Sequence, residues 1–457
     1  MTDTGPAPMG PRSGNGKARV LLIAYHFPPM NVISAYRAEA FAAYLPAHGF
    51  DMSVLTTVCD VGPDGKLAWQ AHGTKVQTTR EGPINVIRIP RTRTLGQRWL
   101  ERALTMPFLG KALTLCFHAS GTFNLHLVQF HAHSKGFLKS HLRTHAYDLV
   151  IASAPPDEHL RLAAWIKRHY GIPFIADYRD PYDLRPMDAR YKRTWKDRLL
   201  LAFKHRYHSQ WTRHCSLLVS ISKPCLEAIA QHHPKARTLE VRNGYFPHKA
   251  LIDGNLIRRD LFKITYAGRI YPWQDVRPFM EAYRIFTARL SPEELRQVDL
   301  AFLGCQDEEQ ANQLRQGLNG LPLRITLKRI PEREARDQVA ESAVLLVFDI
   351  GIRGGYTGKL MDYLGCRRNV LLVPSDHGVM EELIIGAGIG HATGEPTLAA
   401  ERLLRWFREW QTNGRPAFNG HEPVIQEGSR EAQTARLALV AQELIHQRRN
   451  PTAPTTE

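Results

Sequence analysis

Short apolar runs recur along the chain, and between them lie polar loops and segments with apolar residues at helical spacing. Continuous Val, Ile and Leu runs of this length are typical of parallel strands that are buried on both faces. The first half contains such runs at 18–24, 52–56, 86–89, 148–153, 173–176 and 217–221. The second half restarts the pattern, with runs at 263–267, 298–303, 323–327, 344–348 and 370–373. The pattern predicts an α/β protein built from two Rossmann-like, doubly wound domains that face each other across a cleft.

The domain boundaries follow from breaks in this pattern. The chain has 457 residues, which is too long for one ordinary core. Its Gly-, Pro- and Ser-rich start has no apolar periodicity, and neither has the polar stretch before the second set of strands. We therefore expect a disordered leader at 1–17, an N-terminal domain at 18–246, a linker at 247–260, a C-terminal domain at 261–412 and a disordered tail at 449–457.

A glycine-rich loop follows the apolar run at 344–348 and leads into an expected helix that begins near Thr357. Glycine lets the backbone turn freely and approach a ligand closely. The loop and the first helical position contain Gly351, Gly354, Gly355 and Gly358. A loop of this kind at a helix start presents unpaired N–H groups and the positive end of the helix dipole.

Two charged residues make this loop a candidate site for a nucleoside diphosphate. Lys359 places a positive charge in the first helical turn, and Asp362 lies about one turn further along. Amides and Lys359 suit the phosphates, and Asp362 suits the ribose hydroxyls. The alternative interpretation is an ordinary loop before a helix, with a solvated lysine.

The composition narrows the range of partners. The formal net charge of +16 favours nucleotides, nucleic acid or an anionic membrane face. The chain contains no nucleic-acid recognition module or zinc motif, so we expect no nucleic-acid partner. We interpret His126, His131 and His133 as solvated helix residues, and we expect no metal site. The six scattered cysteines form no Cys-x-x-Cys pair, and no apolar run of about 18 residues is present, so we expect a cytoplasmic protein.

Two stretches combine basic and apolar residues. Residues 91–146 are rich in Arg, Lys and His, and a long helix at 191–211 carries an aromatic stripe at every fourth position. Basic amphipathic helices can bind an anionic inner membrane surface or a lipid-linked acceptor, which would place the protein at the periphery of the cytoplasmic membrane. We favour the alternative, in which the insertion packs on the sheet and the aromatic stripe packs into a core.

Polar residues also follow strands of the first half. Asp177, Arg179 and Asp180 come directly after the run at 173–176, and His26 follows the first strand. Ligands of open α/β sheets bind beyond the carboxyl ends of strands. These residues are either part of such a site, or an Asp–Arg pair that holds a loop in place.

Several short motifs share their order and spacing with a known family. They are Tyr25–Pro29 with Arg37, Pro155–Pro156, Ala176–Pro181, Ser220–Ser222, Asn243–Tyr245, Gly268–Arg269 and Thr357–Leu364. With them the sequence resembles bacterial glycosyltransferases of family 4, which have the GT-B arrangement of two Rossmann-like domains. The resemblance extends over residues 19–390 and is weakest at 91–146.

The resemblance implies a retaining transferase that moves a sugar from a nucleotide donor to a polysaccharide or lipid-linked acceptor. It implies a donor site in the C-terminal half and an acceptor site in the N-terminal half, and a C-terminal segment at 413–448 whose helix crosses back to the first domain. Carried over by position, Arg269 and Lys359 bind the donor diphosphate and Asp362 holds the ribose. The same donor site includes Gly268, Gly355, Thr357 and Gly358.

The chemistry of the reaction agrees with these residue types. Glycosyl transfer releases a nucleoside diphosphate, whose developing charge must be stabilised in the transition state. Two cations can replace a metal there, and the chain contains no Asp-x-Asp triplet. We therefore expect a metal-independent enzyme that uses the nucleotide sugar as a substrate and needs no other cofactor. Asp177, Asp180 and His26 are the candidates for catalytic roles at the acceptor hydroxyl.

The chain departs from the family's pattern near the central loop. Asp362 and Gly354 stand where the family has two Glu residues, of which the second contacts the donor sugar, and Met30–Ile33 replaces a glycine-rich loop. Gly354 motivates a second hypothesis, a catalytically degenerate domain that acts as a binding partner in a polysaccharide assembly complex.

Overall fold

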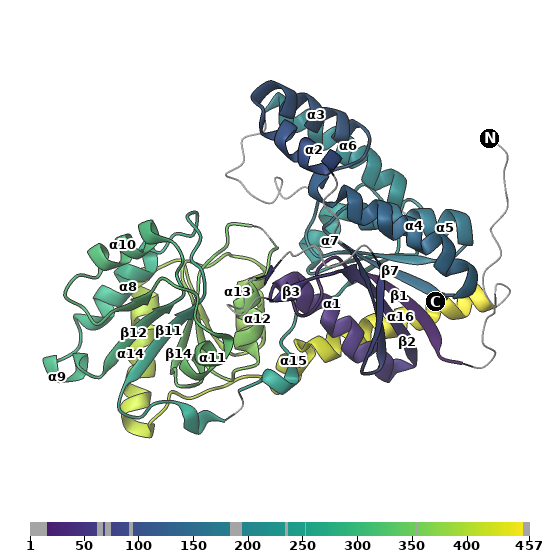
Figure 1. Cartoon of the computed structure of the whole chain (residues 1–457). Coiled ribbons are helices and arrows are strands. Elements are labelled where there is room, and N and C mark those ends of the chain that lie inside the picture. The colour runs from purple at the N-terminus through teal and green to yellow at the C-terminus, as the bar shows by residue number, and fades with distance from the viewer. Residues whose placement is uncertain are drawn as a thin grey trace. The chain divides into compact units, whose positions relative to one another are not determined.

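The computed structural model describes residues 16–61, 67–68, 75–90, 95–182, 194–233, 236–251, 253–352 and 354–450. Contacts divide the chain into two compact units (Figure 1). The first unit comprises the described residues up to Arg242 and returns with Thr434 and the residues after it; the second comprises those from Asn243 to Gln433. The expected leader, except for its last two residues, and the expected tail from 451 onward lie outside the described residues.

The first unit is built on an eight-stranded sheet in the order β10-β9-β8-β7-β1-β2-β6-β5. All neighbours are parallel except the pair β5 and β6. The strands are β1 (Ala18–Ile23), β2 (Phe50–Thr57), β5 (Gln77–Glu81), β6 (Ile84–Ile89), β7 (Leu149–Ala154), β8 (Phe174–Tyr178), β9 (Leu217–Ser220) and β10 (Thr238–Glu240). A separate antiparallel pair is formed by β3 (Asp60–Val61) and β4 (Leu67–Ala68).

Helices cover both faces of this sheet because its strands are apolar on both sides. Leu21 and Ile23 of β1 pack towards one set of helices, and Val20 and Leu22 pack towards the other. The first set is α4 (Val128–Thr144), α5 (Glu158–Tyr170), the end of α6 (Trp195–Thr212) and α7 (Lys223–Ala230). The second set is α1 (Ile33–Tyr44) and the part of α16 (Arg430–Arg449) that belongs to this unit.

The remaining helices of the first unit are α2 (Leu95–Thr105) and α3 (Pro107–Ala119), with short 3-10 turns at Leu45–His48 and Leu125–Leu127. The preference for packing on the sheet is therefore correct for α4, whose Phe130, Leu138 and Leu142 are buried in the core. It is wrong for α2 and α3, because neither helix contributes to the cores on the two faces of the sheet, and α3 contacts α2 and α6.

The second unit contains a six-stranded, wholly parallel sheet in the order β13-β12-β11-β14-β15-β16. Counted along the chain this is the order 3-2-1-4-5-6 of a Rossmann fold. The strands are β11 (Phe262–Ala267), β12 (Val298–Leu303), β13 (Arg324–Thr326), β14 (Val344–Val347), β15 (Asn369–Leu372) and β16 (Gly390–Ala392). The α/β, doubly wound class predicted from the apolar runs is confirmed in both units.

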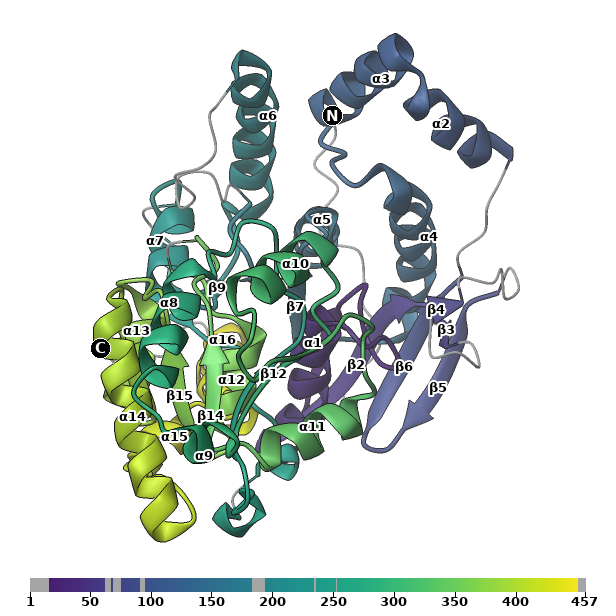
Figure 2. The ribbon, with the colours of Figure 1, turned by 90° about the vertical axis from the view of Figure 1, so that its left-hand side faces the viewer.

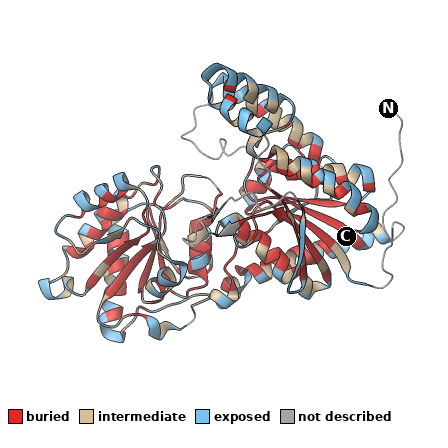
Figure 3. Cartoon of the chain, viewed as in Figure 1, coloured by how far each residue is buried: buried red, intermediate tan, exposed pale blue. Residues whose placement is uncertain are grey.

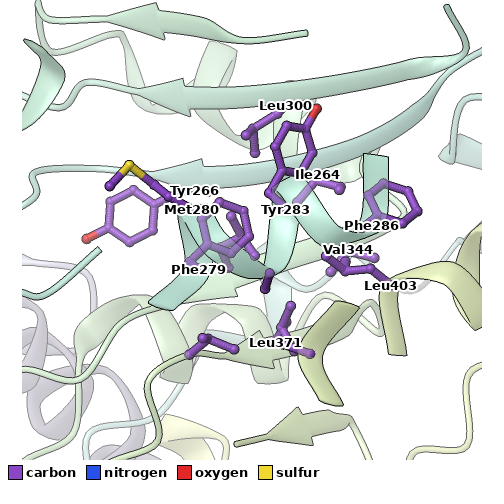
Figure 4. Close-up of a cluster of buried hydrophobic side chains, with 14 of the residues drawn as sticks. Ile264, Tyr266, Phe279, Met280, Tyr283, Phe286, Leu300, Val344, Leu371 and Leu403 are labelled. Atoms are coloured by element: carbon purple, nitrogen blue, oxygen red, sulfur yellow. The ribbon is translucent and has the colours of Figure 1, made fainter. Parts of the chain in front are cut away.

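Aromatic and aliphatic side chains fill the core of the second unit (Figure 4). Tyr266, Phe279 and Phe286 are among its fully buried residues, and they pack with apolar residues of α14. The helices of this unit are α8 (Arg277–Thr287), α9 (Pro292–Leu295), α10 (Glu308–Gly317), α11 (Glu332–Ala340), α12 (Gly358–Leu364), α13 (Val379–Gly386), α14 (Pro396–Asn413) and α15 (Glu422–Glu427). The described part of the expected linker belongs to this unit and forms 3-10 turns at Pro247–Lys249 and Gly254–Leu256.

Candidate functional site

The candidate donor site lies where the strand order of the second unit reverses. The reversal falls between β11 and β14, which are neighbours in the sheet. Loops that leave two such strands diverge and open a crevice at their carboxyl ends. The loop after β11 carries Gly268 and Arg269, and the loop after β14 leads to Lys359. Two segments predicted to bind the donor are thereby brought together, although about 90 residues separate them.

Gly268 and Lys359 are packed against each other. Gly268 has a φ of +116°, and a Cβ atom at this position would lie 2.6 Å from Cε of Lys359. Glycine therefore serves two purposes here, because it adopts the positive φ and leaves space for the lysine. The Nζ atom of Lys359 donates to the backbone carbonyl of Arg269 at 3.1 Å. It also lies 4.8 Å from the centre of the Tyr266 ring, within range of a cation–π interaction.

The surroundings of Lys359 change its titration. Burial lowers the pKa of its ammonium group to about 8, although Asp362 acts in the opposite direction. Near neutral pH the group is thus charged and partly desolvated, and an added phosphate would interact with it more strongly than with a fully hydrated lysine.

Helix α12 begins as the sequence predicted. Thr357 is its N-cap, and its hydroxyl oxygen accepts a hydrogen bond from the backbone N–H of Leu360 at 3.0 Å. Tyr363 of the same helix fixes the helix against β11, because its hydroxyl oxygen accepts the N–H of Ala267 at 3.0 Å. Sequence reasoning placed Tyr363 in the expected helix and in the Thr357–Leu364 motif, without a role of its own.

Gln274 joins the two loops and was not predicted. Its side-chain oxygen accepts from the N–H of Tyr271 at 3.0 Å. Its amide nitrogen donates to the carbonyls of Phe348 and Asp349 at 3.3 and 3.4 Å. A buried amide with this many backbone partners holds the loop after β11 at a set distance from the end of β14.

Asp362 lies on α12 among several charged groups. Its side chain reaches solvent, but the surrounding protein atoms reduce its hydration and raise the pKa of the carboxyl group to about 6. Arg430, and after it Lys249, lower this pKa. Arg430 is buried, with its guanidinium carbon 4.8 Å from the centre of the Phe246 ring. Sequence reasoning missed both cations, since neither belongs to a motif around Asp362.

An exposed cation and two aromatic rings lie in the loop after β11. The guanidinium carbon of Arg269 is 5.1 Å from the centre of the Tyr271 ring. The Tyr271 ring in turn stacks on Trp273, with 4.8 Å between ring centres. This stacking keeps Arg269 at the edge of the loop while its charged group faces solvent.

The glycines of the second loop meet specific backbone requirements. Gly354 is buried with a φ of +76°, a conformation that a glutamate would adopt only under strain. A Cβ atom on Gly355 would lie 2.7 Å from Cδ1 of Ile350. The local backbone thus suits glycine at the position where the resembled family has an acid.

In the first unit, Asp177 is part of a buried ion pair. Its carboxylate accepts from Nη2 of Arg37 at 2.6 Å and from the Ser153 hydroxyl at 2.9 Å. Nη1 of Arg37 donates to the carbonyl of Val241 at 2.8 Å. The network connects α1, β7, β8 and the residue after β10. Of the two interpretations given for Asp177, the geometry favours the pair that holds a loop, but the partner is Arg37 rather than Arg179.

Asp180 and His26 reach solvent at the carboxyl ends of the strands. Asp180 follows β8, and reduced hydration raises the pKa of its carboxyl group. His26 follows β1 and is half-buried, with its ring against the edge of Tyr25 at 5.1 Å. Arg179 is buried and donates to the carbonyls of Ala154 and Pro155, so it supports the loop after β7. β1 and β7 flank the strand-order reversal of the first unit.

The structure also bears on metal binding and membrane crossing. Across the described ranges, no group of three or more His, Cys, Asp or Glu side chains is placed to hold a metal ion. None of the helices within those ranges has both the length and the apolar character needed to cross a bilayer.

Comparison with known proteins establishes the fold. No protein-family model matches the sequence, and no curated protein matches it significantly. Among solved structures, the chain is similar to Anabaena HepE in complex with UDP and glucose, with a TM-score of 0.54, 13% identity and coverage of 93% of this chain and 100% of that one.

Two synthases of trehalose phosphate from Burkholderia are also similar. The UDP-forming enzyme of Burkholderia xenovorans, in complex with glucose-6-phosphate, has a TM-score of 0.56 at 14% identity, covering 93% of this chain and 100% of that chain. The enzyme of Burkholderia multivorans has a TM-score of 0.58 at 11% identity, covering 94% and 100%. Identities this low speak only for the fold, and membership of family 4 stays a prediction. The chain has the GT-B fold of two Rossmann-like domains that these glycosyltransferases share.

Proposed function

We propose that the protein is a glycosyltransferase that moves a sugar from a nucleoside diphosphate donor to a polysaccharide or lipid-linked acceptor. The observation that carries the proposal is the meeting of Lys359 and Arg269 on the two loops that leave the strand-order reversal of the second unit. Similarity to structures of HepE with UDP and of a UDP-forming synthase supports UDP as the first nucleotide to test.

In this proposal the donor diphosphate binds between the two loops. Lys359 acts as a point charge, and the exposed guanidinium of Arg269 can contact two phosphate oxygens at once. Gly268, Gly355 and Gly358 have no side chains of their own that would keep a phosphate away from the backbone. Thr357 fixes the first turn of α12, which presents Lys359, and Asp362 accepts from the ribose hydroxyls.

The reaction breaks the bond between the anomeric carbon and the diphosphate oxygen and forms a bond to an acceptor hydroxyl oxygen. We propose that the new bond forms on the same face, so that the configuration is retained, and that the hydroxyl proton passes to the departing diphosphate. Lys359 and Arg269 stabilise the negative charge that grows on this leaving group, which is the work a metal ion performs in other enzymes. The proposed reaction therefore requires no divalent cation.

The acceptor would bind to the first unit. Asp180 and His26 reach solvent at the carboxyl ends of β8 and β1 and can bind or orient an acceptor hydroxyl. Asp177 is a positioning residue in this proposal, because Arg37 and Ser153 occupy its carboxylate oxygens. All six cysteines are free thiols, which fits the reducing cytoplasm as the place of the reaction.

A thermal-shift screen tests the donor site. Wild type would be screened against UDP, GDP, ADP, CMP, dTDP and their common sugar conjugates, beside Lys359→Ala and Arg289→Ala. Arg289 is an exposed cation just after α8, in the segment that leads to the start of β12 rather than in a loop that leaves the end of a strand. We expect one diphosphate to stabilise wild type and Arg289→Ala but not Lys359→Ala. Equal stabilisation of all three would place the nucleotide elsewhere.

Gly354 favours a second candidate, a non-catalytic GT-B protein that binds a partner in an assembly complex. The buried glycine at this position removes an acid that contacts the donor sugar in the resembled family. A protein of this kind would neither hydrolyse nor transfer sugar from any nucleotide sugar, with or without acceptor. Release of free nucleoside diphosphate from any sugar conjugate, followed over time by chromatography, would exclude this candidate.

A further inference from the structure

Three helical segments of the first unit expose an unusual amount of apolar surface. We call them the helical arm: α2, α3 and residues 195–200 at the start of α6. Of the fourteen large apolar residues that are exposed in the described ranges, seven belong to the helical arm, and an eighth, Met106, joins α2 to α3. The most exposed are Phe108 at 89%, Leu95 at 82% and Trp195 at 70%. A concentration of this kind marks a contact surface, because exposed apolar residues are normally scattered singly.

The aromatic stripe of α6 is buried at the end of the helix and exposed at its start, where the helical arm begins. Trp211, near the end of the helix, is 7% exposed and belongs to the core cluster that also contains residues of α4 and α5. Trp195 lies on the same stripe at the start of the helix, with its ring largely in solvent. The prediction that the stripe packs into a core is thus correct at one end of α6 and wrong at the other. Figures 1 and 2 show the start of α6 extending away from the sheet.

Helix α3 is the most apolar element of the helical arm and is scarcely covered. Lys111 is its one charged residue, and Gly110 is its one buried residue. Near the end of the helix, the Tyr207 hydroxyl donates to the carbonyl of Ala119 at 2.6 Å. Figure 3 shows most of α2 and α3 in the colour of exposed residues. A helix normally buries its apolar face against another surface, so we expect α3 to have a partner that covers this face.

The charges of the helical arm indicate the chemistry of that partner. Its basic residues are all exposed, namely Arg98, Arg102, Lys111, Lys196 and Arg198. The acidic residues are Glu101 and Asp197, and Asp197 is engaged in the capping box of Thr194. A surface of large apolar residues edged by cations complements lipid tails edged by anionic headgroups. A symmetric contact between two copies would instead bring like charges together.

We propose that the helical arm docks the protein on an anionic lipid bilayer. Phe108, Leu95 and Trp195 would enter the boundary between headgroups and acyl chains, while the basic residues contact lipid phosphates. Helices of 11 and 13 residues are too short to cross the bilayer, so they would lie in its plane. The inference goes beyond the proposed transferase activity and does not depend on it, and it would bring a lipid-linked acceptor to the first unit.

Vesicle flotation tests the proposal with full-length protein. Vesicles of phosphatidylcholine alone would be compared with vesicles that also contain phosphatidylglycerol. The test variant is Phe108→Asp with Trp195→Asp, and the control is Leu439→Asp, which changes an apolar residue of α16 that is 62% exposed. We expect wild type and control to float with the anionic vesicles only, and the double variant to lose at least about tenfold in partition. Added salt should weaken the binding of wild type.

Three results would overturn the proposal. They are equal flotation with neutral and anionic vesicles, equal partition of wild type and double variant, and a dimer of wild type that the double variant loses without any vesicle binding. Sedimentation velocity detects the last of these. Thermal unfolding of the double variant, with and without the nucleotide found in the screen, checks that its fold and donor site are intact. Failure of lipid binding is thereby separated from failure of the proposed function.

Discussion

Gly268→Ala tests the central contact of the candidate donor site. The new methyl group would lie 2.6 Å from Cε and 3.3 Å from Nζ of Lys359. Carbon atoms in contact prefer about 3.5–4.0 Å, so the lysine end must move by about 1 Å. The side chain is flexible and can do so at little cost in stability. Its ammonium group, however, leaves the position set by the Arg269 carbonyl, where we propose that phosphate binds.

The movement of Lys359 should therefore appear as a loss of UDP affinity. A displacement of about 1 Å in a binding group can cost up to about a hundredfold, and we expect UDP affinity to fall by about 10–100-fold. The positive φ separately costs about 1–3 kcal/mol in the free energy of unfolding. Titration calorimetry measures the first quantity and urea unfolding the second.

Gly320→Ala provides the matched control. Gly320 also has a positive φ, of +79°, but a Cβ atom there would have no neighbour within 4 Å. It should lose a similar free energy of unfolding and keep full affinity for UDP. If Gly268→Ala binds UDP as tightly as Gly320→Ala, the position of Lys359 does not matter for the nucleotide and the proposed site is wrong.

Three further predictions concern the two units. Because burial lowers the pKa of Lys359 to about 8, UDP affinity should fall by up to about tenfold per pH unit above about pH 8, and calorimetry on Lys359→Arg, which stays ionised, should show no such fall. Gln274→Leu should lower the free energy of unfolding by about 1–3 kcal/mol in urea and weaken UDP binding, since it removes the link between the loops; unchanged affinity would contradict this. Asp177→Asn should cost about 3–5 kcal/mol in urea unfolding, because it leaves Arg37 buried without its countercharge, while UDP affinity of the folded variant stays at the wild-type value; a loss below about 1 kcal/mol would show that the pair is not structural.

Local sequence features predicted the parts of the site that depend on local structure. The glycine-rich loop, the helix start near Thr357 and the position of Lys359 all follow from a strand, a turn and a helix start within a few residues. The meeting of Gly268 with Lys359 followed from the family resemblance and from the rule that ligands bind at carboxyl ends of strands.

Contacts between distant segments could not be predicted in this way. Arg37 and Asp177 are 140 residues apart, so nothing in the order of residues pairs Asp177 with Arg37 rather than with Arg179 two positions away. The position of Arg430 near Asp362 depends on how the chain returns after α15. For α6, periodicity reveals an apolar stripe but does not reveal whether core or solvent lies beside it.

The position of α16 near the end of the chain determines when the first unit can complete its folding during synthesis. Its residues Leu437, Ala438, Ala441 and Ile445 cover one face of the sheet that the N-terminal part of the chain forms. A ribosome therefore releases the last piece of the first unit only after the whole second unit has been made. Until then that sheet face remains uncovered, and a nascent chain that stops before Thr434 should be a substrate for chaperones.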